Sequence, residues 1–148
     1  MIIAVIGAGS CSSEIYGIAE EVGKLIALNG AVLLTGGLGG VMEAASKGAK
    51  EAGGTTVGIL PGFSKEEANP FVDIPITTGL SHARNIIVVR AADAVIAIAG
   101  KYGTLSEIAL ALKLGKPVIG IKTWDIDGVV SVNSPDEAVQ KAFRLSSK

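Results

Sequence analysis

Arg84 and Glu107 are residues of types that could do charge-stabilising chemistry. A carboxylate can stabilise positive charge that develops in a transition state. An arginine can bind a phosphate through two hydrogen bonds, or it can hold a carboxylate in place. However, Thr104-x-x-Glu107 also has the spacing of a helix capping box. A purely structural role for Glu107 therefore stays open at this point.

Three glycine-rich loops could bind a phosphate group. They cover residues 7–13, 36–40 and 100–104, and each follows a short apolar run. Glycine lets main-chain N–H groups approach an anion closely, and the start of the following helix adds partial positive charge. The alternative for any one loop is that its glycines only permit a tight turn. The candidate binding residues are Gly9, Ser10, Gly36, Gly37, Gly39, Gly40, Gly100, Lys101, Tyr102, Gly103 and Thr104.

Four side chains near these loops have two interpretations each. Lys101 is either a cation for the phosphate or a solvated loop lysine, and Tyr102 either stacks on a base or packs against its own turn. His82 either faces the same pocket as Arg84 or lies at the surface near a helix start. Cys11 is either a thiol with a pKa lowered by a helix N-terminus or an inert small residue.

The elements that would position these residues alternate along the chain. Short, continuously apolar runs are typical of strands covered on both faces, and they occupy residues 2–6, 31–35, 55–60, 94–98 and 117–121. Segments with helical spacing cover 14–28, 41–52, 80–92 and 104–114, and Ser134 and Pro135 begin a last helix. The irregular segment 63–78 holds at most one short strand, near 72–76. This order predicts an α/β fold, a Rossmann-like three-layer α/β/α arrangement with a mostly parallel sheet.

The composition excludes several classes of protein. The 148 residues fit one domain over 1–148, and a net charge of −1 without a basic stripe predicts no nucleic-acid partner. One Cys and one His rule out a disulfide framework and a Cys/His zinc site, so we expect no metal. No apolar run approaches the ~18 residues of a membrane helix, and the first residues do not resemble a signal peptide. We therefore expect a cytoplasmic protein with no membrane partner.

Two common nucleotide-binding motifs are missing from the sequence. The first loop has G-x-G but lacks the third glycine of the dinucleotide fingerprint, and the second strand ends in Thr35-Gly36 without an acidic residue. The P-loop pattern G-x-x-x-x-G-K-[ST] does not occur. NAD binding and P-loop NTPase activity are therefore disfavoured.

The segment 81–107 carries a more specific resemblance. It reads SHARNIIVVRAADAVIAIAGKYGTLSE, an Arg-containing helix followed by an apolar strand and a glycine turn. This segment resembles the SLOG superfamily, once labelled "possible lysine decarboxylases", which includes the LOG phosphoribohydrolases, the DprA/Smf proteins and the molybdenum-cofactor carriers. Gly9-Ser10 and the segment 36–42 match the family's first two glycine loops. The resemblance is closest to the carrier-like branch, and it implies a bound nucleotide or phosphate with no other cofactor required.

The family motif P-G-G-x-G-T-x-x-E stands here as Ala99-Gly100-Lys101-Tyr102-Gly103-Thr104-Leu105-Ser106-Glu107. The resemblance implies that this turn holds the phosphate, that Glu107 works near the ribose and that Arg84 assists. Ala99 replaces the family's Pro, Lys101 replaces its second Gly, and Asn85 stands where the hydrolases usually have Lys.

Two functions follow from a retained phosphate frame beside altered catalytic positions. The first is a carrier or sensor that binds a phosphorylated small molecule, a nucleoside monophosphate or a pterin-type cofactor. The alternative is a nucleoside 5′-monophosphate phosphoribohydrolase that uses Glu107 and Arg84. Lysine decarboxylation is disfavoured because no lysine lies in a recognisable setting for pyridoxal phosphate.

A homodimer or homotetramer is expected from the low content of charged residues, 18%, and from the helix predicted over 104–114. That helix is apolar nearly all round, which is typical of a helix buried on more than one side. Together with 80–92 it is the candidate interface, in agreement with the resemblance, because SLOG proteins are dimers or larger.

Overall fold

A computed structural model describes residues 1–147. The chain forms a seven-stranded sheet with the order β4-β3-β2-β1-β5-β6-β7, and every neighbouring pair of strands is parallel. The predicted α/β class and Rossmann-like arrangement are confirmed. The strands are β1 (Ile2–Gly7), β2 (Val32–Thr35), β3 (Thr56–Leu60), β4 (Ile74–Thr77), β5 (Ala94–Ile98), β6 (Val118–Ile121) and β7 (Val129–Val132).

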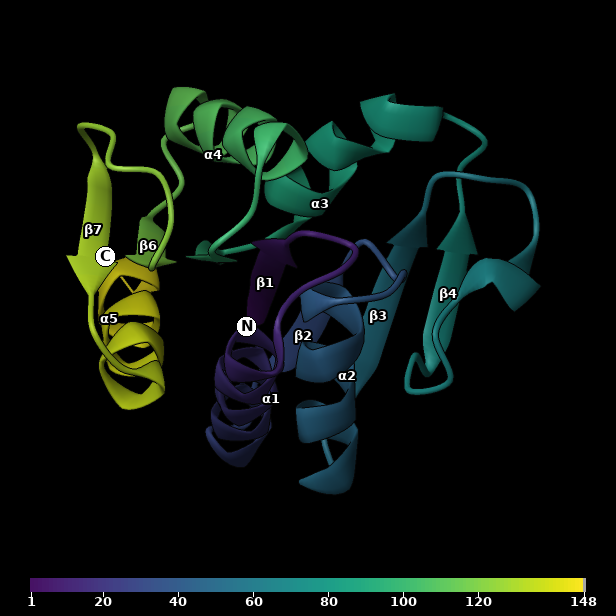
Figure 1. Ribbon diagram of the computed structural model, residues 1–148, viewed down its shortest axis with the longest axis horizontal. Helices are drawn as coiled ribbons and strands as arrows, with labels where there is room; N and C mark the ends of the chain where they lie inside the picture. Colours follow the sequence, from purple (N-terminus) through teal and green to yellow (C-terminus); the bar gives the residue numbers. More distant parts are fainter. Residues whose placement is uncertain (148) are drawn as a thin grey trace.

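Helices cover the two faces of the sheet unequally (Figure 1). On one face lie α1 (Ser13–Leu28), α2 (Val41–Glu51) and α5 (Pro135–Ser146). On the other face, α3 (Asn85–Ala91) and α4 (Tyr102–Lys113) pack on β1, β5 and β6. Two short 3₁₀ helices, η1 (Lys65–Glu67) and η2 (Ser81–Arg84), lie before and after β4. No helix among residues 1–147 combines the length and the apolar character needed to cross a membrane.

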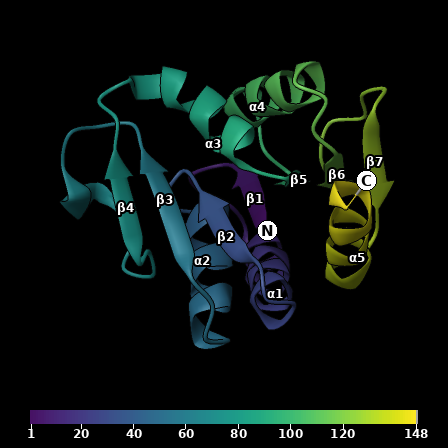
Figure 2. The ribbon, with the colours of Figure 1, turned by 180° about the vertical axis from the view of Figure 1, so that it is seen from behind.

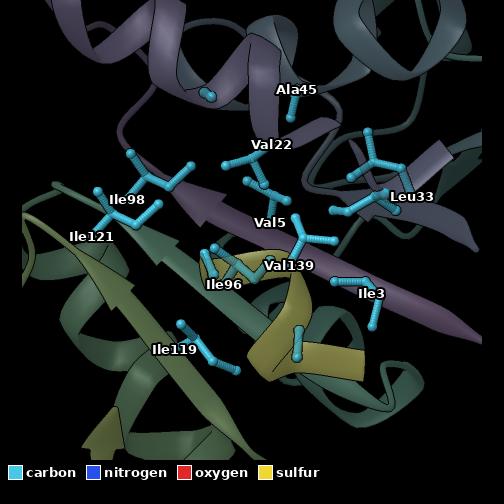
Figure 3. Packing of buried hydrophobic residues seen from close by; sticks show 14 of the residues in the cluster. Ile3, Val5, Val22, Leu33, Ala45, Ile96, Ile98, Ile119, Ile121 and Val139 are labelled. Atoms are coloured by element: carbon cyan, nitrogen blue, oxygen red, sulfur yellow. The ribbon is translucent and has the colours of Figure 1, made fainter. Parts of the chain in front are cut away.

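The central strands are buried on both faces, as their continuously apolar sequences require. Ile3 and Val5 of β1 and Ile96 and Ile98 of β5 are fully buried beneath α1, α2 and α5, together with side chains of β6 such as Ile121 (Figure 3). A second cluster, under α3 and α4, is built on the alternate residues of the same strands. This packing holds the carboxyl ends of β1 and β5 rigidly side by side.

Glycines allow α1 and α2 to approach each other closely. A Cβ atom added at Gly23 would lie 1.9 Å from the carbonyl oxygen of Ala45, and one added at Gly48 would lie 1.9 Å from that of Glu20. Only a residue without a side chain fits at such a contact.

Three elements differ from the sequence-based prediction. The strand β7 was not predicted, because it lies at the sheet edge and its burial, from exposed Ser131 to buried Val132, follows no clear pattern. The helix predicted over 80–92 is an η2–α3 pair, and Ser81 has a positive φ of 53°, which a regular helix does not allow. The helix predicted over 104–114 begins two residues earlier, at Tyr102.

The chain reverses its direction of winding between β1 and β5. From β1 it continues to β2, β3 and β4 on one side, whereas from β5 it continues to β6 and β7 on the other (Figure 2). The loops that follow these two strands therefore lead to helices on opposite faces, α1 and α4. Open α/β sheets bind their ligands in the crevice at such a point.

Candidate functional site

A cavity of about 230 Å³ lies at this crevice, at the carboxyl ends of the central strands. It is bordered by the loops after β1 and β2, by η2 and by the first turns of α3 and α4. The residues that line it are Val5, Ile6, Gly7, Ala8, Gly9, Gly36, Met42, His82, Arg84, Asn85, Lys101, Gly103, Thr104 and Glu107. The structure thus brings Arg84 and Glu107 together, along with five of the predicted binding residues.

Arg84 is held at the wall of the cavity by three hydrogen bonds. Its side chain is buried, Nε donates to the carbonyl oxygen of Ile59 at 2.9 Å, and Nη2 donates to that of Gly36 at 3.4 Å. Nη1 donates to Oδ1 of Asn85. A guanidinium has five N–H groups, so one N–H on each terminal nitrogen has no partner within the described residues 1–147. Two such donors match two oxygens of a phosphate or a carboxylate.

Gly36 leaves the space that the guanidinium of Arg84 occupies. A Cβ atom at this position would lie 2.6 Å from Nη2 of Arg84 and 2.8 Å from Sδ of Met42. The glycine is therefore required by the arginine, which reaches the loop from η2 across the end of the sheet.

Glu107 is the one carboxylate that lines the cavity within residues 1–147. It is 7% exposed, and burial raises the pKa of its carboxyl group to about 7, against the opposing effect of the nearby charge of Arg84. No hydrogen bond within residues 1–147 contributes to that pKa. Near neutral pH the group is present both as an acid, which can donate a hydrogen bond, and as a carboxylate, which can accept one or stabilise positive charge.

The capping-box interpretation of Thr104 and Glu107 is wrong. The helix α4 begins at Tyr102, with Lys101 at the N-cap position and no side-chain cap. Thr104 is therefore the third residue of the helix, and Glu107 lies in its second turn. Because the helix starts two residues before the predicted cap, the carboxyl group of Glu107 is free to face the cavity.

The start of α4 is the part of the site best suited to an anion. Gly103 and Thr104, in the first turn of this twelve-residue helix, line the cavity, and exposed Lys101 precedes them. The partial positive charge of the helix N-terminus, the ammonium of Lys101 and the guanidinium of Arg84 outweigh the single carboxyl group.

The remaining predicted glycines face other parts of the chain rather than this cavity. A Cβ atom at Gly39 would lie 2.9 Å from the carbonyl oxygen of Gly9, and one at Gly40 would lie 2.2 Å from that of Ala8, so the first two loops pack backbone against backbone. Gly37 packs against β3, and Gly100, with a φ of 91°, packs against the side chain of Thr104.

Ser10 and Gly100 line a neighbouring cavity of about 260 Å³, which shares Ala8 and Lys101 with the first. Cys11 lies there as well, and burial together with the charge of Glu43 raises the pKa of its thiol. Of its two interpretations, the inert residue is the one that agrees with this environment, because a raised pKa disfavours a reactive thiolate.

Asn85 has a positioning role that sequence reasoning did not find. Besides accepting from Arg84, it donates from Nδ2 to Oγ of Ser106 at 3.5 Å, and Ser106 donates to the carbonyl oxygen of Gly103 at 2.7 Å. Asn85 thereby links the arginine to the first turn of α4. Its position directly after Arg84 was the available signal, but in the sequence it was noted only as a departure from the hydrolase pattern.

Ala99 has a backbone conformation that proline cannot adopt. Its φ is +47°, whereas a proline ring holds φ near −65°. A proline at position 99 would therefore require a different backbone conformation of this loop. The loop is held by Oγ1 of Thr123, which donates to the carbonyl oxygen of Ala99 at 2.6 Å, and by Nε1 of Trp124, which donates to that of Lys101 at 3.1 Å.

A family model, the SLOG cluster4 family, matches residues 1–146. The chain belongs to this family. The SLOG cluster4 chain is also similar to two solved structures over nearly its whole length. It is 44% identical to the molybdenum cofactor binding protein of Rippkaea orientalis, with a TM-score of 0.92, 97% of this chain covered and 95% of that one. It is 39% identical to the molybdenum cofactor carrier protein of Chlamydomonas reinhardtii, with a TM-score of 0.90, 99% of this chain covered and 98% of that one.

An enzyme is among the relatives of the SLOG cluster4 chain. A cytokinin riboside 5′-monophosphate phosphoribohydrolase of Mycobacterium tuberculosis is 35% identical over 122 residues. The match covers 76% of this chain and 65% of the enzyme, so part of the enzyme has no counterpart in the match. The family match and the similarity to the two molybdenum cofactor proteins confirm the predicted relationship to the SLOG proteins and to their carrier-like branch.

Proposed function

We propose that the chain binds a phosphorylated small molecule, a nucleoside monophosphate or a pterin-type cofactor, and acts as a carrier or sensor without turnover. The observation that carries this proposal is that the buried guanidinium group of Arg84, Lys101 and the first turn of α4 line one cavity. The similarity to molybdenum cofactor binding and carrier proteins supports it.

The lining residues fit both parts of such a ligand. Arg84 and the start of α4 offer donors to its phosphate, and the carboxyl group of Glu107 can bind the hydrogen-bonding edge of its ring or sugar. Among residues 1–147, no group of three His, Cys, Asp or Glu side chains is placed to hold a metal ion. If the ligand is a molybdenum cofactor, Arg84 and the start of α4 would contact its phosphate.

The second candidate is a nucleoside 5′-monophosphate phosphoribohydrolase, which the buried carboxyl group of Glu107 near the charge of Arg84 favours. In its ionised form Glu107 would stabilise positive charge on the ribose while the N-glycosidic bond breaks. A water oxygen would form the new bond to the sugar carbon, and the water proton would go to the departing base. The similarity to the phosphoribohydrolase supports this alternative.

One set of incubations tests both functions. The protein is mixed with AMP, IMP, GMP, CMP and a phosphorylated pterin, thermal shift reports binding, and chromatography reports free base and ribose 5-phosphate. We expect a thermal shift without release of base. Release that is lost in Glu107→Gln would establish the hydrolase and overturn the carrier, and neither shift nor release would overturn the phosphate site itself.

Lys101 and Lys113 provide a matched pair of variants for the same assay. They lie at the two ends of α4, and both are exposed. Lys101→Ala removes a cation beside the cavity and should weaken binding of ribose 5-phosphate by about tenfold, as expected for loss of one charge-assisted hydrogen bond. Lys113→Ala makes the same change of charge at the far end of the helix and should leave the affinity unchanged.

We further propose that the chain forms a homodimer or a larger homo-oligomer. Exposed apolar side chains at the edge of the sheet support this proposal, because a second copy could cover them. Ile74 and Ile76 of the edge strand β4 are 47% and 44% exposed, on the face of the sheet where α3 and α4 pack on β1, β5 and β6. Light scattering coupled to size-exclusion chromatography tests this, and the mass of a monomer at micromolar concentration would overturn it.

A further inference from the structure

A second hollow, of about 660 Å³, lies between α3 and α4. Its walls are mostly apolar and include Ala83, Ile86, Tyr102 and Leu110. Of its polar side chains, Asn85 already accepts from Arg84, and the hydroxyl of Ser106 already donates to the carbonyl oxygen of Gly103. The groove therefore offers mainly apolar surface, which suits an apolar or aromatic group.

The groove is continuous with the phosphate cavity. His82, Asn85 and Gly103 line both hollows. A molecule whose anionic end binds at the start of α4 can thus extend past Gly103 into the groove. The cavity of about 230 Å³ is smaller than the ~300–1,000 Å³ that small-molecule sites usually have, so the rest of such a ligand must lie outside it.

Tyr102 offers an aromatic surface at the junction. Its side chain is 80% exposed, although it stands in the first turn of a helix whose other apolar residues are mostly covered. Its ring lies 6.2 Å from that of Trp124, centroid to centroid, at an interplanar angle of 31°. Trp124 is itself held by its hydrogen bond to the carbonyl oxygen of Lys101 and does not line the groove. The indole ring of Trp124 therefore lies near the ring of Tyr102 without occupying the groove.

Gly103 leaves room for a flat group beside this ring. A Cβ atom added there would meet no other heavy atom within 4 Å, so the space over the first turn of α4 is open. This open space adjoins Tyr102 in the groove that Ile86 and Leu110 also line.

We propose that the groove between α3 and α4 binds the planar heteroaromatic ring of the ligand whose phosphate occupies the cavity at the start of α4. This subsite rests on the proposed function, and it assigns the ligand class as a phosphate ester that carries a nucleobase-like or pterin-like ring. Stacking on Tyr102 provides affinity without selecting strongly among rings, because every such ring has a π face.

The test compares ligands with and without a ring. Calorimetric titrations with AMP, GMP and ribose 5-phosphate are made on the wild type, Tyr102→Ala and Tyr102→Phe, with Phe63→Ala as the control. Phe63 is another exposed aromatic residue, 89% exposed, and does not line either hollow. We expect Tyr102→Ala to weaken AMP and GMP by about five- to a hundredfold, the range that loss of one stacking partner covers. Ribose 5-phosphate should be unaffected, and Tyr102→Phe and Phe63→Ala should bind like the wild type.

Several outcomes would overturn the subsite. AMP affinity within twofold of the wild type in Tyr102→Ala would show that no ring stacks there, and an equal loss for ribose 5-phosphate would show that Tyr102 only shapes the turn. A fall in the mass of the assembly in Tyr102→Ala would identify a second copy of the chain as the occupant of the groove. If the wild type binds AMP and GMP no more tightly than ribose 5-phosphate, the subsite alone is refuted. If it binds neither the nucleotides nor ribose 5-phosphate, the proposed function is refuted and the subsite with it.

Discussion

Replacing Glu107 by Gln should stabilise the protein at alkaline pH and not at acidic pH. Burial raises the pKa of the carboxyl group from 4.5 to about 7. Below pH 4.5 the group is neutral in both the folded and the unfolded chain, so its burial costs no ionisation energy. Between pH 4.5 and 7 it ionises in the unfolded chain but stays protonated in the folded one, and the free energy of unfolding falls over this window. The shift corresponds to about 3 kcal/mol by pH 8.

Urea denaturation, followed by the fluorescence of the single tryptophan, measures this difference. At pH 8 we expect Glu107→Gln to unfold at a urea concentration about 2 M above that of the wild type, for an m-value near 1.5 kcal/mol/M. At pH 4.5 the two midpoints should nearly coincide. Glu21→Gln, which changes an exposed carboxylate on α1, is the control and should have little effect at any pH. Equal stabilities of Glu107→Gln and the wild type at pH 8 would refute the desolvation of Glu107.

Four further substitutions test the packing and the backbone conformation of the chain. Gly36→Ala would place a Cβ atom 2.6 Å from Nη2 of Arg84; we expect a folded protein by circular dichroism that binds AMP at least about tenfold more weakly, because the two free donors move. Gly23→Ala would place a Cβ atom 1.9 Å from the carbonyl oxygen of Ala45, and separation of α1 and α2 should lower the free energy of unfolding by about 2 kcal/mol or more. Ala99→Gly relieves a positive φ and should raise stability by about 1 kcal/mol. Ala99→Pro should lower it, and an unchanged melting temperature in Ala99→Pro would contradict the φ that the loop shows.

The strands of the sheet were predicted well because a continuously apolar run is a strong local signal. The run that became β5 is apolar throughout and buried throughout. The strand β7 was missed because an edge strand is covered less, so its residues need no consistent pattern. The predicted start of α4 was also wrong by two residues, although the helix itself was predicted. That small error matters here, since it decided whether Glu107 was read as a cap or as a side chain facing the cavity.

The candidate site was predicted in its position but not in its details. The clustering of glycines after apolar runs indicated the edge of the sheet at which the cavity lies. Local sequence does not tell whether a glycine faces a ligand or another stretch of backbone: Gly9 lines the cavity, whereas Gly39 and Gly40 fit one loop onto another. Gly36 lines the cavity as well, but its small size serves Arg84, which is 48 residues away along the chain.

The sequence by itself determined the α/β class, the parallel sheet and the edge at which the candidate site was expected, because these depend on local apolar runs and on the turns that end them. The tertiary structure decided the chemistry of the site. The raised pKa of Glu107 is a consequence of burial beneath elements distant in sequence, and the orientation of Arg84 depends on carbonyl groups of Ile59 and Gly36, which β3 and the loop after β2 supply. The groove beside Tyr102 exists only because α3 and α4 pack side by side. Desolvation and directed hydrogen bonding arise between segments, so no local pattern records them.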